Sequence, residues 1–139
     1  MECTVKWTGE GMAFQAETGS KHTLMMDGPP DAGGHNLAAR PMELVLAGTG
    51  GCTAFDVVLI LKKGRHAVSG CEVSLKAERA DSDPKVFTHI HFHFRVSGKQ
   101  LKPEAVARAI ELSKEKYCSA SIMLGKTAKI THDFEIVED

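Results

Sequence analysis

The sequence contains no excess of either charge. Lys and Arg number 17 against 18 Asp and Glu among 139 residues, which gives a net charge of -1. Nucleic acids and anionic lipid surfaces attract proteins through clustered positive charge, so this balance argues against both classes of partner. We therefore expect one globular domain over residues 1–139, with neither a nucleic-acid nor a membrane partner.

The N-terminal region also lacks the features of a secretory signal. Its first residues, MECTVKWTGEG, contain no basic segment followed by an apolar one. The four cysteines lie far apart and form no C-x-x-C pair, which excludes the usual zinc and thioredoxin motifs. They are Cys3, Cys52, Cys71 and Cys118. We expect a cytoplasmic protein whose cysteines are buried apolar residues or reactive thiols.

One stretch of the chain, residues 42–61, is almost entirely apolar and contains only two charges, Glu43 and Asp56. It is just long enough to span a bilayer, but its Gly-Thr-Gly-Gly sequence weakens a helix and Asp56 is costly in lipid. We predict instead a soluble helix from Pro41 to about Lys63. A helix that is apolar on every side must be buried on every side, and the rest of this chain is too short to enclose it. We therefore expect a homodimer.

The remaining segments are predicted as strands and shorter helices. Glycines divide residues 3–26 into three short strands. Alternating apolar and polar residues over 68–81 and 85–98 predict a half-buried antiparallel hairpin. Helical spacing predicts an amphipathic helix over 103–116 and a short second helix after it, and the chain ends in a strand over 128–137. This β-β-β-α-β-β-α-α-β order argues for an α+β fold.

Cys52 lies near the middle of the long helix and has two interpretations. A thiol in a buried helix is commonly a packing residue. Gly50 and Gly51, however, remove side chains beside it, so that another backbone or a small ligand can approach, at a cost of about 1 kcal/mol each in helix propensity. A sulfur nucleophile must be ionised. Asp56, one turn further along on the same face, opposes that ionisation by its charge.

Two charged residues near the start of the helix are candidate site residues. Arg40 is a candidate cation for a Cys52 thiolate across the dimer, or else a solvated residue at the end of a loop. Glu43 lies nine residues before Cys52, on the opposite side of a straight helix. Its alternative role is to stabilise the first helical turn beside Pro41.

Cys118 and a row of histidines are the other candidates. Cys118 lies 66 residues after Cys52, so the sequence does not establish that they meet. If the fold joins them, they match the attacking and resolving thiols of a peroxide-reducing enzyme. His89, His91 and His93 point to one side of a strand, where two such histidines can bind zinc, but no third ligand is evident and we expect no metal.

The segments RPMELVLAGTGGCTAFDVV and KYCSASIML, at this separation and between these strands, resemble the OsmC/Ohr family, and most closely its YhfA-type branch. The resemblance covers essentially the whole chain, including FTHIHFHF in the predicted hairpin. It implies an OsmC-like α+β fold, built as an intertwined homodimer around a long buried central helix.

The resemblance also implies a thiol-dependent peroxidase with a role in oxidative stress defence. Active members of the family reduce organic hydroperoxides, and hydrogen peroxide less well, without a metal or flavin cofactor. Cys52 would then be the peroxidatic cysteine and Cys118 the resolving one, with Glu43 and Arg40 as charged partners. An external dithiol, lipoyl-type in the Ohr branch, would reduce the resulting disulfide. The Ohr branch has its glutamate at the position of Met42, one residue earlier than here.

A protein of a different class is also compatible with these residues. A non-catalytic module could bind a lipid-like or aromatic small molecule in an apolar cavity of the dimer. In that case Gly50 and Gly51 provide space, and Cys52 only lines the cavity.

Overall fold

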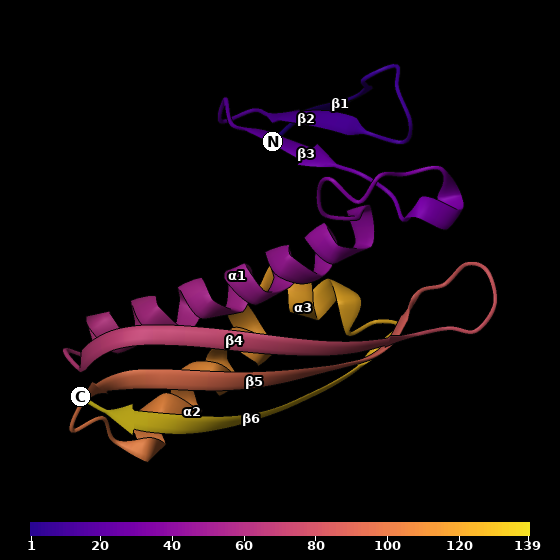
Figure 1. The fold of residues 1–139 in the computed structure, drawn as a ribbon. Coiled ribbons are helices and arrows are strands. Elements are labelled where there is room, and N and C mark those ends of the chain that lie inside the picture. Colours follow the sequence, from indigo (N-terminus) through magenta and orange to yellow (C-terminus); the bar gives the residue numbers. More distant parts are fainter. The chain divides into compact units, whose positions relative to one another are not determined.

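The computed structural model describes all residues from Met1 to Asp139. It divides into two compact units, residues 1–47 and 48–139, with the boundary inside the long helix. The expected single domain stays a prediction. The order of the main helices and strands is the predicted one, with a short 3-10 turn and a π-helical turn added, and it defines an α+β fold (Figure 1).

The first unit contains the three-stranded meander expected from the sequence. Strands β1 (Cys3–Trp7), β2 (Phe14–Thr18) and β3 (Thr23–Met26) pair antiparallel in chain order. The loop that follows includes one 3-10 turn, η1 (Pro30–Ala32). The glycine breaks between the strands therefore predicted this sheet correctly.

A buried carboxylate, Asp27, organises the start of that loop. It accepts hydrogen bonds from the backbone N–H groups of Gly28, His35 and Leu37 at 2.7, 3.2 and 3.1 Å. These bonds favour the ionised form, so the pKa of Asp27 is lowered. The loop is thus held by a side chain that the sequence analysis did not single out.

Helix α1 has the predicted bounds, Pro41–Lys63. By length and composition alone it could cross a membrane: an 18-residue window has a mean hydropathy of 2.0, and 28% of that window is buried within the chain. The core helix of a soluble protein can meet the same criterion, so this property does not identify a membrane span.

Within one chain, α1 buries only one face. The buried residues recur every three or four positions, as expected for one side of a helix. They are Thr49, Gly50, Thr53, Val57 and Leu61. On other sides of the helix, Phe55 is 69% exposed and Leu59 is 39% exposed. The complete burial expected for this helix is therefore not reached by a single chain.

The second unit is built on a three-stranded sheet in the order β4-β5-β6. Strands β4 (Ala67–Arg79) and β5 (Phe87–Lys99) form the predicted antiparallel hairpin. Strand β6 (Lys129–Glu138) pairs parallel to β5 on its other edge. Parallel neighbours require a crossover connection, and the helical segment between β5 and β6 provides it.

That crossover differs from the prediction in one place. Helix α2 (Pro103–Leu112) ends before residue 116, and the chain widens into the π-helical turn η2 (Ser113–Tyr117). The N–H of Cys118 closes this turn on the carbonyl of Ser113 at 2.8 Å. The short helix α3 (Ser119–Leu124) follows, as expected. Periodic spacing of apolar residues does not distinguish a final α turn from a wider one.

The two faces of strand β5 differ as the alternating pattern predicted. Its apolar residues point into a core shared with α1 and α2, and the helices of this unit lie on that side of the sheet (Figure 1). The strand contributes Ile90, Phe92, Phe94 and Val96, and helix α2 contributes Val106, Ala109 and Ile110. The histidines of β5 lie on the opposite face, where they are partly exposed.

Gly50 allows α1 to approach strand β4 closely. A Cβ atom at position 50 would lie 2.6 Å from Cδ1 of Leu75, whereas one at Gly48 or Gly51 would have no neighbour within 4 Å. The space expected beside Cys52 is therefore occupied at Gly50 by a side chain of the same protein, and open at Gly51.

We expect Gly48→Ala to stabilise the protein by about 1 kcal/mol, because alanine favours the helix and the site is open. Gly50→Ala should gain less or destabilise, since Leu75 must move to admit the methyl group. Free energies of unfolding from urea titrations would measure the difference. Equal stabilisation by both substitutions would contradict the close approach of helix and strand.

Candidate active site

Two cysteines that are distant in the sequence meet in the second unit. Cys52 lies on α1 and is partly exposed, whereas Cys118 lies at the start of α3 and is completely buried. Their thiols are close enough that Cys52 affects the ionisation of Cys118. Both are free cysteines. The fold thus brings together the pair whose proximity the sequence left open.

The surroundings of Cys118 hold its sulfur in a defined position. The sulfur accepts a hydrogen bond from the backbone N–H of Ser121 at 3.4 Å, and the Ser121 hydroxyl donates to the Cys118 carbonyl at 3.3 Å. Burial raises the pKa of Cys118, and the neighbouring Cys52 raises it further, while the contacts with Ser121 lower it. An ordinary thiol already ionises above neutral pH, so Cys118 is mainly protonated there.

A pair of buried hydroxyl groups joins α1 to the turn that leads to Cys118. Ser113 donates a hydrogen bond to the Asp56 carboxylate at 2.9 Å and lies 2.8 Å from the hydroxyl of Thr53. Because the Ser113 proton is directed to Asp56, the Thr53 hydroxyl is the donor to Ser113. Asp56 therefore has a structural partner. Its expected opposition to a Cys52 thiolate stays a prediction.

A shallow apolar groove lies along the exposed side of α1. Its volume is about 460 Å³, and it is lined by Gly51, Ala54, Phe55, Val58, Leu59, Lys62 and Cys71. Burial raises the pKa of Cys71, which makes this thiol a poor nucleophile. Cys3 is an exposed residue of β1 in the first unit. Gly51, the residue that precedes Cys52 in the chain, lines this open groove.

Arg40 and Glu43 belong to the first unit, and the structure gives Glu43 a helix-capping role. Its carboxylate accepts a hydrogen bond from the backbone N–H of Arg40 at 2.9 Å, which satisfies a donor at the start of α1. This contact agrees with the interpretation of Glu43 as a residue that stabilises the first turn. The catalytic roles of both residues stay predictions.

The row of histidines on β5 is engaged with strand β6. Asp133 Oδ1 lies 3.1 Å from His91 Nε2 and 2.8 Å from His93 Nδ1. Thr131 lies 2.8 Å from a ring nitrogen of both His89 and His91. No group of three or more His, Cys, Asp or Glu side chains has an arrangement that could hold a metal ion. These imidazoles therefore connect strands β5 and β6.

Several polar residues close to the thiols were not predicted from the sequence. Thr53, Ser113 and Ser121 have no distinctive spacing, so no signal in the sequence marks them. His132 had a detectable signal: it falls in phase with the apolar residues of β6 and pairs with Phe92 of β5. A histidine on an otherwise apolar face is a polar exception of the kind that merits attention.

An α+β sheet covered by a long apolar helix, with two thiols in contact, defines the class of this protein. The sequence profile of the OsmC-like protein family matches residues 34–133. Protein YhfA of Escherichia coli (strain K12) is 51% identical over 137 residues, which cover 99% of this chain and 98% of YhfA. The chain belongs to the OsmC-like family.

Solved structures agree with this assignment. A hypothetical protein from Aquifex aeolicus VF5 has a TM-score of 0.86 at 27% identity, over 99% of this chain and 96% of that one. An organic hydroperoxide resistance protein from Elizabethkingia anophelis has a TM-score of 0.73 at 17% identity, over 97% and 94% of the two chains. At 17% identity, the similarity to the Elizabethkingia anophelis protein shows a shared fold.

The contact between His93 and Asp133 predicts a specific titration. The hydrogen bond to Asp133 raises the pKa of His93, and the bonds to His93 and His91 lower the pKa of Asp133. We expect Asp133→Asn to lower the pKa of His93 toward its ordinary value, as followed by NMR of the imidazole protons. Asp139→Asn, which removes a carboxylate elsewhere, is the control.

The sign of the effect on stability follows from these directions. A raised His93 pKa stabilises the folded protein below the imidazole's unfolded pKa, and this contribution is lost as pH rises through the folded value. A lowered Asp133 pKa stabilises above the carboxyl's unfolded pKa, and this is lost as pH falls. The His93–Asp133 pair therefore stabilises the folded protein mainly at pH values between the pKa of Asp133 and the pKa of His93. An unchanged His93 titration in Asp133→Asn would contradict the contact.

Proposed function

We propose that this protein is a thiol-dependent peroxidase that reduces organic hydroperoxides, and hydrogen peroxide less well, in cytoplasmic defence against oxidative stress. The single observation that supports this most is the contact between Cys52 and Cys118. A two-thiol peroxidase requires one sulfur to react with peroxide and a second within reach to form a disulfide. A protein of the same fold is named for organic hydroperoxide resistance.

In this proposal Cys52 reacts first. Its thiolate attacks the terminal oxygen of the hydroperoxide, the O–O bond breaks, and the alkoxide takes up a proton to leave as an alcohol. Cys52 is then a sulfenic acid. The Cys118 sulfur attacks the Cys52 sulfur, the S–O bond breaks, and water leaves as the disulfide forms.

The environments of the two sulfurs support this order. Cys52 is partly exposed and follows Gly51, which lines the open groove, whereas Cys118 is buried. The raised pKa of Cys118, caused mainly by burial, favours its protonated form, so it is the poorer first nucleophile. An external dithiol of the lipoyl type then reduces the disulfide by thiol–disulfide exchange. No resident cofactor takes part.

We infer that the active protein is a homodimer. Phe55 and Leu59 expose apolar surface along the groove on α1, and such a surface is typical of a protein interface. A second copy would cover this helix and complete the burial that one chain leaves unfinished. In that dimer Arg40, with Glu43 beside it, would supply positive charge to the Cys52 thiolate.

Peroxide treatment tests the proposed chemistry directly. One equivalent of an alkyl hydroperoxide should convert the reduced protein to a Cys52–Cys118 disulfide, detected by peptide mass spectrometry. Cys52→Ser should abolish peroxide consumption, because no sulfenic acid can form. Cys118→Ser should react once and then stop, with the sulfenic acid trapped by dimedone. Cys3→Ser and Cys71→Ser are matched controls that should retain full turnover.

The same experiment separates the peroxidase from the binding module. Unchanged peroxide consumption in Cys52→Ser would overturn the peroxidase proposal. Thiols that fail to react with hydroperoxide, in a protein that retains an apolar small molecule, would identify the non-catalytic alternative.

The dimer predicts a sensitive position at Phe55. Phe55→Glu places a charge in the exposed apolar groove. The dissociation constant of a dimer formed there should therefore rise by about tenfold or more. Analytical ultracentrifugation would measure this. Ser82→Glu, in the exposed loop between β4 and β5, adds the same charge elsewhere and should leave the dimer intact. A monomeric wild-type protein would refute the inference.

A further inference from the structure

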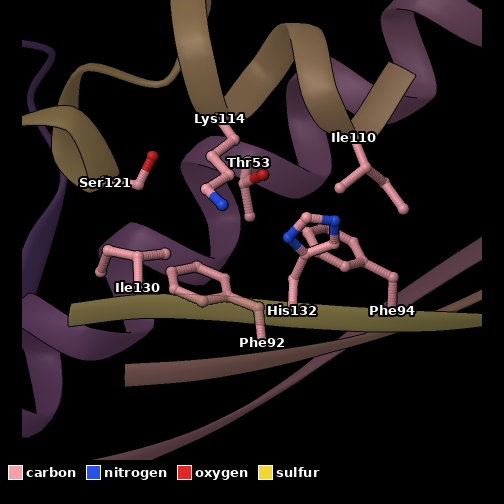
Figure 2. A pocket seen from close by; sticks show the side chains of 8 residues that line it. All are labelled: Thr53, Phe92, Phe94, Ile110, Lys114, Ser121, Ile130 and His132. Atoms are coloured by element: carbon pink, nitrogen blue, oxygen red, sulfur yellow. The ribbon is translucent and has the colours of Figure 1, made fainter. Parts of the chain in front are cut away.

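One polar contact lies in the mainly apolar interior where α1 meets the crossover. The hydroxyl groups of Thr53 and Ser113 are 2.8 Å apart, and both residues are buried. Around Thr53 this interior is lined by Phe92, Phe94 and Ile110 (Figure 2). A hydroxyl group removed from water is costly unless it finds a hydrogen-bond partner. These two hydroxyls therefore hold each other in place among apolar side chains.

The Thr53–Ser113 contact lies one step from each thiol. Thr53 follows Cys52 directly in α1. On the other side, the carbonyl of Ser113 accepts a hydrogen bond from the N–H of Cys118 at 2.8 Å, which closes the turn η2. A single hydrogen bond between side chains thus couples the backbone that carries the first thiol to the backbone that carries the second.

Asp56 fixes the direction of this contact. Its carboxylate accepts the Ser113 proton at 2.9 Å, so the Ser113 oxygen is left to accept the proton of Thr53. Asp56 also lines an open groove of about 340 Å³ beside α1, where its charge remains in contact with solvent. The three side chains therefore form one directed series of donors, and its charged end is hydrated.

Stability alone does not require these hydroxyls. Replacing both partners of a buried hydrogen bond by apolar groups of similar shape is nearly neutral or even stabilising. The neighbouring buried positions of α1 and α2 are apolar: Val57, Leu61, Val106, Ala109 and Ile110. What a hydrogen-bonded pair adds to such an interior is one fixed arrangement of the segments that it joins. A π-helical turn, the form of η2, is also frequent at functional sites.

We propose that Thr53 and Ser113 are positioning residues for the second chemical step, in which Cys118 attacks the oxidised Cys52. The inference rests on the peroxidase proposal. In this step the Cys118 sulfur gives up its proton and bonds to the Cys52 sulfur. The S–O bond of the sulfenic acid breaks, and the departing hydroxide takes up a proton and leaves as water.

The two chemical steps differ in their need for this contact. A disulfide forms only at a defined separation and dihedral angle of its two cysteines. The rate of the second step therefore depends on how closely the turn before Cys118 is held to α1. The first step involves Cys52 and the peroxide alone. Loss of the Thr53–Ser113 contact should therefore slow the second step and spare the first.

Single-turnover kinetics separate the two steps. Reduced protein is mixed with one equivalent of tert-butyl hydroperoxide and quenched at intervals, and mass spectrometry measures the sulfenic acid and the disulfide. We expect Thr53→Val and Ser113→Ala to form the sulfenic acid at the wild-type rate but to close the disulfide about tenfold more slowly. Thr53→Ser retains the hydroxyl group and should close the disulfide at nearly the wild-type rate.

The double variant Thr53→Val, Ser113→Ala tests whether the two residues act through one contact. It should be no slower than the slower single variant, because each substitution already removes the same hydrogen bond. Effects that multiply would contradict this. A merely structural role would lower the amount of folded protein, and with it the amplitude of both steps. Circular dichroism verifies folding, which should persist because water can replace Ser113 at the hydrated Asp56 carboxylate.

Equilibrium with glutathione measures the same positioning without peroxide. Glutathione disulfide oxidises the two protein thiols to the Cys52–Cys118 disulfide and is reduced to two glutathione thiols. The effective concentration of the thiol pair should fall about tenfold in Ser113→Ala. If the wild type fails to react with hydroperoxide, the peroxidase proposal fails, and this equilibrium decides the positioning role. An unchanged rate of disulfide closure, or in an inert protein an unchanged effective concentration, would overturn the inference.

Discussion

The apolar surface of helix α1 is the constraint on which the rest of this structure depends. One side packs against the sheet, and Gly50 permits that contact by leaving room for Leu75. This packing fixes the rotation of the helix, and with it the direction in which Cys52 points. The remaining apolar side is left for another surface to cover. The placement of Cys52 and the uncovered apolar surface thus arise from the same helix.

Two buried hydroxyl groups and the carboxylate of Asp56 position the second half of the site. The Thr53–Ser113–Asp56 contacts join α1 to the wide turn η2, and that turn leads directly into Cys118. Buried hydroxyls that are fully hydrogen-bonded specify one arrangement of the elements they join. The carboxylate of Asp56 accepts the hydrogen bond of Ser113 and thereby orients the segment that carries the second thiol.

Much of the fold was predictable because its signals are local. Alternation in strand β5, glycine breaks in the first sheet, and Pro41 at the start of α1 each depend on neighbouring residues alone. The parallel pairing of β6 was not predictable, since alternation within a strand does not reveal its partner. The contact between the two candidate thiols was not predictable either, because it depends on how α1 and the crossover pack. For Glu43 the local role at the start of α1 was predictable, whereas its role in catalysis stays a prediction.

The parallel pairing of β6 has a consequence for the order of folding. His91 and Thr131 are separated by 40 residues yet lie in hydrogen-bond contact, so closing this part of the sheet carries a large loop entropy. Contacts of such separation form slowly compared with the local hairpin of β4 and β5. The contact between Cys52 and Cys118 spans 66 residues, so by the same argument the thiol pair also assembles after the hairpin.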